Sequence, residues 1–148
     1  MKQVSLFIGF FIIAFTACQK DAEIITIDTA VPQGAFTISR QGNISEQNNT
    51  GSKGTVQVGL DSKSTYFLKF GSDFSTVLAT GTVTVYFSTS NTFKADPAKG
   101  NPDLKLAGTV SKNGEMYIKL SGPIESKFTH LILWCGSANI PFGNASLN

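Results

Sequence analysis

Short runs in which apolar and polar residues alternate follow one another along most of this chain. Because successive side chains of a strand point to opposite faces, this alternation predicts strands with one buried face each. The runs lie at residues 36–39, 55–60, 66–70, 83–88, 116–120 and 129–135. The side chains that we expect to face inward are Phe36, Ile38, Val56, Val58, Leu60, Tyr66, Leu68, Phe70, Val83, Val85, Phe87, Met116, Ile118 and Leu120. The pattern predicts an all-β fold.

Segments rich in Asn, Gly, Ser, Asp or Pro separate these runs and predict loops. They lie at residues 41–52, 61–64, 91–102 and 111–114. Six or more short strands at this spacing, without a helical period, favour a single antiparallel β-sandwich or Greek-key barrel. The pattern does not choose between these two. With 148 residues, the chain is long enough for one such domain.

The N-terminus has the organisation of a signal peptide. Lys2 supplies a positive charge, residues 4–15 are apolar, and two small residues precede Cys18. The apolar run is too short to span a membrane as a helix. We therefore expect a signal peptide at residues 1–17. The alternatives are a plain secretory signal followed by an ordinary cysteine, or a short buried helix.

The sequence Phe-Thr-Ala-Cys at 15–18 resembles the lipobox of bacterial lipoproteins, although Phe15 stands where Leu is usual. The resemblance implies that the chain is cleaved before Cys18 and that this cysteine carries fatty acyl chains such as palmitate. Two or three acyl chains hold a protein durably on a membrane. The membrane is thus the first expected partner, reached through the N-terminal lipid.

The next five residues, Gln-Lys-Asp-Ala-Glu at 19–23, are similar to the signal that sends some Gram-negative lipoproteins to the cell surface. We expect a lipid-anchored protein of the outer membrane, with its domain either in the periplasm or exposed on the surface. Residues 18–32 are interpreted as the lipidated cysteine and a flexible tether, with a candidate short strand at 24–27. The all-β domain then occupies residues 33–148.

Charge and histidine content exclude several classes of function. The formal net charge is only +2 and the basic residues are scattered, so no nucleic-acid partner is expected. His130 is the one histidine, which argues against a metal site and against a conventional enzyme. Three Asn-x-Ser/Thr triplets, at Asn43, Asn48 and Asn144, resemble glycosylation acceptors but are interpreted as chance matches in a bacterial chain.

Once Cys18 carries lipid, Cys135 is the only other cysteine and no intramolecular disulfide can form. Strand alternation places Leu131, Leu133 and Cys135 on one face and His130, Ile132 and Trp134 on the other. Two interpretations of Cys135 stay open. It is either a small buried hydrophobe or a reactive thiol, and the local sequence offers no cation to activate a thiol.

The C-terminal run at 131–147, LILWCGSANIPFGNASL, resembles the end of the electron-transfer DM-thirteen domain family. That family closes on a hydrophobic strand ending in Trp-Cys, followed by an Asn-Val-x-Phe-Gly-x-Ala-x-Leu tail. Gly-Ala-Phe at 34–36, Gly-Thr-Val at 54–56 and Val-Thr-Val-Tyr-Phe-Ser at 83–88 match its upstream elements. The likeness covers about residues 33 to 147.

This resemblance implies a redox or electron-transfer role centred on Cys135, together with a redox partner protein. Trp134 and Phe142 become its packing or cofactor-contacting neighbours, and the cofactor itself is not identified. The alternative is a non-catalytic envelope or surface module. Such a module would bind a protein or a glycan through the predicted loops at 41–52 and 91–102.

Overall fold

The computed structural model describes residues 30–79, 81–94 and 100–148. The regular structure of these residues consists of eight strands, and every pairing between them is antiparallel. They are β1 (Phe36–Glu46), β2 (Gly54–Asp61), β3 (Tyr66–Phe70), β4 (Val83–Ser88), β5 (Leu104–Thr109), β6 (Met116–Lys119), β7 (His130–Cys135) and β8 (Ile140–Ser146). The predicted all-β class is confirmed. Cys18 and the candidate strand at 24–27 lie outside the described residues.

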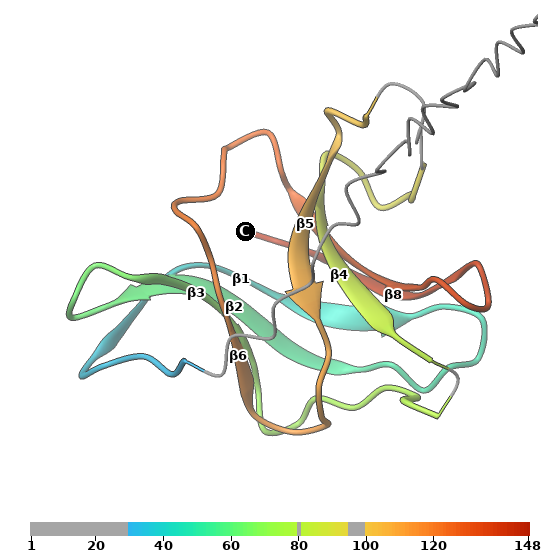
Figure 1. Cartoon of the computed structure of the whole chain (residues 1–148), viewed down its shortest axis with the longest axis horizontal. Coiled ribbons are helices and arrows are strands. Elements are labelled where there is room, and N and C mark those ends of the chain that lie inside the picture. The colour runs from blue at the N-terminus through green and yellow to red at the C-terminus, as the bar shows by residue number, and fades with distance from the viewer. Residues whose placement is uncertain (1–29, 80, 95–99) are drawn as a thin grey trace, which may run out of the picture.

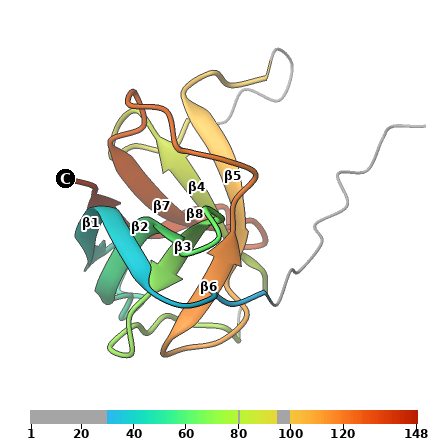
Figure 2. The ribbon, with the colours of Figure 1, turned by 90° about the vertical axis from the view of Figure 1, so that its left-hand side faces the viewer.

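The strands form one sheet in the order β5-β4-β7-β8-β1-β2-β3-β6. The sheet curls into a nearly closed barrel, so that its two edge strands, β5 and β6, come side by side (Figures 1 and 2). At Gly108 of β5 an added Cβ would lie 2.9 Å from Cγ2 of Ile118 on β6. The edges therefore touch at this point through packing. In the described ranges, no helix has the length and apolar character needed to cross a membrane.

The core fills the inside of this barrel. Most of the side chains predicted to face inward are buried there, while Leu60 and Tyr66 are half-buried. The confirmed core residues are Val56, Val58, Leu68, Phe70, Val83, Val85, Phe87, Met116, Ile118 and Leu120. Alternation thus predicted the inner faces of β2, β3, β4 and β6.

The first half of β1 departs from the prediction. Ile38 is 44% exposed, and Phe36 lies outside the barrel with its ring 6.4 Å from that of Tyr117. The reason is a β-bulge between Ile38 and Arg40, which shifts the register against β2 and exchanges the faces. After the bulge, Arg40 occupies a half-buried position and Ile44 is buried.

The predicted loop at 41–52 is wrong in its first half, because β1 continues to Glu46. Residues up to Ile44 pair with β2, and Ser45 and Glu46 pair with β8. Pairing on both sides holds this polar segment extended, although its composition is typical of a loop. Tertiary context here overrides local propensity.

The alternation did not predict β5 or β8 as strands. β8 contains Pro141 and Gly143, which are uncommon inside strands. Pro141 sits opposite Trp134, beside a bulge in β8 that arises because Leu133 pairs with Gly143 and the next residue, Trp134, pairs with Pro141. β8 is central to the fold, since it joins β7 to β1 and so connects the two halves of the sheet.

Candidate functional site

Cys135 ends β7 and faces the core. Its side chain is fully buried, as are those of Leu131 and Leu133 on the same face. The Cys135 Sγ lies 3.3 Å from the Oγ of Ser137, at hydrogen-bonding distance. The predicted division of β7 into two faces is confirmed. The thiol is thus packed among apolar neighbours.

Trp134 and Phe142, the two expected neighbours of the thiol, lie on different sides of the sheet. Phe142 of β8 is 2% exposed and belongs to the same core cluster as Cys135. Trp134 is half-buried on the outer face, where the ring of Phe93 stacks on it. The sheet therefore separates Trp134 from the other two.

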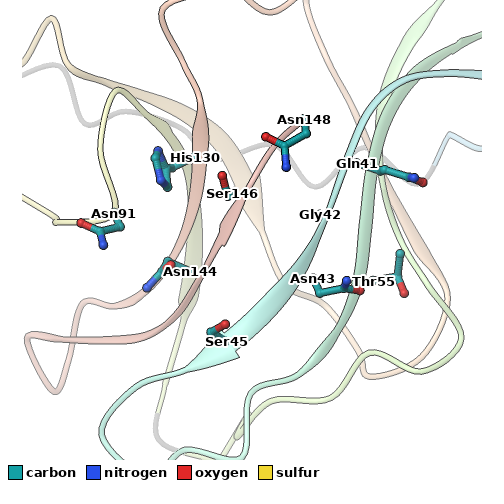
Figure 3. Close-up of a pocket in the computed structure, with 10 residues that line it drawn as sticks. All are labelled: Gln41, Gly42, Asn43, Ser45, Thr55, Asn91, His130, Asn144, Ser146 and Asn148. Atoms are coloured by element: carbon teal, nitrogen blue, oxygen red, sulfur yellow. The ribbon is translucent and has the colours of Figure 1, made fainter.

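The outer face carries a polar cleft of about 840 Å³ across strands β7, β8, β1 and β2. Figure 3 shows side chains from these strands and from the loop after β4 gathered around it. The lining residues are Gln41, Gly42, Asn43, Ser45, Thr55, Asn91, His130, Asn144, Ser146 and Asn148. Five of the ten are carboxamides, and none is Asp, Glu, Lys or Arg.

Strand alternation places these side chains on one face. In β1, Gln41, Asn43 and Ser45 point outward while the intervening Ile44 is buried. In β8, Asn144 and Ser146 point outward and Ala145 is buried. The cross-strand pairs are Asn43–Thr55, Ser45–Asn144 and Ser146–His130. Polar side chains on neighbouring strands therefore stand opposite one another across the cleft.

The cleft lies where β1 passes from one half of the sheet to the other. The backbones of Gln41 and Asn148 exchange two hydrogen bonds, of 2.9 and 3.0 Å. Gly42, the next residue of β1, lies very close to β8. A Cβ added at this position would lie only 2.0 Å from the backbone oxygen of Ser146. Only glycine allows the two strands to approach this closely.

An aromatic cluster holds the loop that carries Asn91 against the sheet. The rings of Phe93 and Trp134 stack with centroids 3.9 Å apart, and the ring of Tyr86 meets Phe93 at 5.2 Å. Ile132, which precedes Trp134 on the outer face, is fully buried. The stack on Trp134 thus ties Phe93, two residues after Asn91, to the outer face of the sheet.

The chemistry of the cleft is that of neutral hydrogen bonding. A carboxamide both donates and accepts, as does a hydroxyl group. The ring of His130 adds one more polar group, whose Nδ1 lies 2.9 Å from the Oγ1 of Thr129. In the part of the chain that the structure describes, no three His, Cys, Asp or Glu side chains gather to hold a metal ion.

The residues of this cleft form a pattern in the sequence that was interpreted as loop composition. Asn43 and Asn144 begin two of the triplets interpreted as chance matches, and both line the cleft. Polar residues at every second position of 41–45 and of 144–148 form two outward-facing rows. The segments 41–52 and 91–102, predicted as binding loops, each contribute residues to it.

Comparison with protein-family models, with curated proteins and with solved structures finds no match to this chain. The resemblance to the DM-thirteen domain family, and the roles it implies for Cys135, Trp134 and Phe142, therefore stay predictions.

Proposed function

We propose that this protein is a lipid-anchored module of the bacterial outer membrane that binds a neutral glycan in the polar cleft. The observation that carries the proposal is the lining itself, with five carboxamides and no formally charged carboxylate, ammonium or guanidinium group. Sugar hydroxyls are both donors and acceptors, so carboxamides can pair with two neighbouring hydroxyls at once. The anchor is the predicted acylation of Cys18.

The lining favours a glycan over a protein partner. Protein interfaces are centred on large apolar or aromatic side chains with a polar rim. The ten lining residues of the cleft include none of these. A charged polysaccharide would require basic or acidic side chains, which this lining lacks. A neutral, hydroxyl-rich ligand fits the groups that are present.

The test is glycan-array screening of the full chain in detergent, followed by calorimetric titration of the best neutral ligand. Gln41→Ala and Asn144→Ala each remove hydrogen bonds, which should raise Kd about threefold to tenfold. Gln33→Ala is the matched control, because Gln33 is an exposed amide outside the cleft. Affinity should change little with salt, since the ligand is neutral. Failure to bind any neutral glycan contradicts the proposal. Binding of a protein in the same cleft would also contradict it and would indicate a protein-binding module.

The redox role of Cys135 is the second candidate, and the family resemblance is what favours it. Its thiol lies in the core beside Ser137. A redox partner could reach it only if the end of β7 opened. Alkylation of the native protein and its absorbance spectrum test this role. A thiol that reacts only after unfolding, in a protein without visible absorbance, contradicts it.

A further inference from the structure

Four polar side chains of the cleft form one row that crosses four neighbouring strands. The row consists of His130 of β7, Ser146 of β8, Asn43 of β1 and Thr55 of β2. The strand register pairs His130 with Ser146 and Asn43 with Thr55. Three strand spacings of about 4.8 Å make this row about 14 Å long.

The two halves of the row meet between β8 and β1. These strands pair at Gln41–Asn148, through two backbone hydrogen bonds, and again at Ser45–Asn144. The middle members of the row lie midway between these two pairs, so the same register places them opposite each other. Carboxamides flank the row on both sides, with Asn144 on one side and Gln41 and Asn148 on the other. The row therefore forms a continuous polar floor between carboxamide walls.

The row is closed at its β7 end. Ser88 of β4 pairs with His130 and would continue the row, but its side chain is only 1% exposed. The Oγ of Ser88 accepts a hydrogen bond from the backbone N–H of Ser90, in the loop after β4. Asn91 of the same loop lies beside His130 at this end of the cleft (Figure 3). The loop therefore ends the accessible row at His130.

The opposite end of the row, at β2, is in contact with solvent. The neighbour of Thr55 on this side is Gly71, whose backbone N–H donates to the backbone oxygen of Thr55 and which has no side chain. The carboxylate of Asp73 lies beside them and accepts hydrogen bonds from the backbone N–H and the hydroxyl of Thr55. Asp73 is exposed, so a ligand can leave the cleft over this end. Its negative charge disfavours an anionic chain here.

We propose that the cleft receives one end of a linear neutral glycan. The terminal sugar lies against Asn91 and His130, and the following sugars lie along the row toward Thr55. A pyranose ring is about as long as the spacing between two strands, about 4.8 Å, so the row accommodates about three rings. The volume of the cleft, about 840 Å³, lies in the range of sites for ligands of this size. This inference rests on the proposed function and concerns the shape of the same ligand.

A series of chain lengths tests how the ligand lies. Linear neutral oligosaccharides of glucose, mannose, galactose and xylose, from disaccharide to hexasaccharide, are titrated calorimetrically into the full chain in detergent. In the series that binds best, Kd should fall about tenfold or more from disaccharide to tetrasaccharide and change little beyond that length. Equal Kd values for the disaccharide and the hexasaccharide would overturn this inference and leave the proposed function intact. Absence of binding in every series would contradict both.

Substitutions at the two ends of the row test the position of the terminal sugar. Asn91→Ala should raise Kd about threefold to tenfold for both the disaccharide and the tetrasaccharide, because the lost carboxamide lies at the closed end. Gln41→Ala, nearer the open end, should raise Kd for the tetrasaccharide by a similar factor and leave the disaccharide unchanged. Gln33→Ala, outside the cleft, is the control and should change neither. A larger effect of Gln41→Ala than of Asn91→Ala on the disaccharide would contradict the proposed direction.

The number of protein molecules bound to each polysaccharide chain tests the closed end. The probe is a linear neutral polysaccharide with the sugar and linkage of the best series, prepared in two lengths. At saturation, calorimetric titration should give one protein molecule per chain for both lengths, because only one kind of chain end enters the cleft. A ratio that increases with the length of the polysaccharide would show binding to internal sugars and would overturn this inference, although the protein would still be a glycan-binding module.

Discussion

The rings of Phe93 and Trp134 lie face to face, with centroids 3.9 Å apart and planes inclined by 15°. Phe93 belongs to the loop after β4 and Trp134 to the outer face of β7, so this single contact joins the loop to the sheet. Asn91, two residues before Phe93, lines the cleft. The stack therefore connects the loop that carries Asn91 to the sheet beside the cleft.

Phe93→Ala should weaken glycan binding without unfolding the protein. Stacked aromatic pairs contribute about 0.5–1.5 kcal/mol beyond the area they bury, so Kd should rise by about tenfold at most. Hydrogen exchange at residues 89–94 should accelerate in parallel. Phe36→Ala, which removes a ring from the outer face near Tyr117, should leave Kd unchanged. Equal effects of the two substitutions on Kd would show that the stack has no special part in binding.

Arg40 fastens the segment before β7 to β1. Its guanidinium donates hydrogen bonds to the backbone oxygens of Phe128 and Ile124, both at 2.6 Å, and of Glu125 at 3.1 Å. Arg40→Met should lower the free energy of unfolding by about 2–3 kcal/mol, because three carbonyls lose a charged donor. Urea denaturation measures this loss. Lys53→Met, at an exposed residue, should cost little, and similar losses in both variants would contradict the assignment.

Gly42→Ala tests the close approach of β1 and β8. A Cβ at this position would lie 2.0 Å from the Ser146 oxygen, so the strands must move apart. We expect a loss of about 1–3 kcal/mol in the free energy of unfolding, together with weaker ligand binding. Gly136→Ala is the control, because an added Cβ there meets no atom within 4 Å. An unchanged melting temperature in Gly42→Ala would argue against this packing.

Asp61 makes stability depend on pH. Hydrogen bonds from the backbone N–H of Gln33, and then of Thr65 and Lys63, lower the pKa of this carboxyl below its ordinary value. The folded state therefore binds this proton less readily than the unfolded state, and the contribution of Asp61 is complete above the unfolded pKa. It is lost as the pH falls through the lower, folded pKa. We therefore expect the free energy of unfolding, measured by denaturation at a series of pH values from neutral to acidic, to fall less steeply in Asp61→Asn than in the unsubstituted protein. An equal dependence of this free energy on pH in the two proteins would contradict the role of Asp61.

The inner faces of the barrel could be predicted from alternation, because burial on one side imposes a strict period of two. The exposed position of Ile38 could not be predicted, because the bulge between Ile38 and Arg40 changes which residues of β1 face inward. No local sequence signal marks this bulge. β8 also escaped prediction, because Pro141 and Gly143 are tolerated only through its place between β7 and β1. Both differences arise from contacts with strands distant in the sequence.

The cleft was predictable only in part. The segments that contain Gln41 and Asn91 were named as binding loops in the alternative function, and Asn91 does lie in a loop. The polar composition around Gln41 was also interpreted as loop, but this residue belongs to β1. His130 and Asn144 lie at the cleft because β7 pairs with β8 and β8 pairs with β1. The register of these pairs depends on strands that are distant in the sequence, so it could not be predicted from any one segment. The family resemblance implied Trp134 as a neighbour of the thiol, whereas strand alternation predicted it on the opposite face, and the structure agrees with the alternation.

The central claim is the proposed binding of a neutral glycan in the cleft. Titration of the full chain with the neutral glycan selected by array screening tests it most directly, when the cleft and the thiol are altered separately. Asn91→Ala combined with Asn144→Ala should raise Kd about tenfold to hundredfold, because two carboxamides of the lining are lost. Cys135→Ala should leave Kd unchanged, since its side chain is buried on the other face of the sheet. Binding that survives the double substitution but disappears with Cys135→Ala would contradict the account.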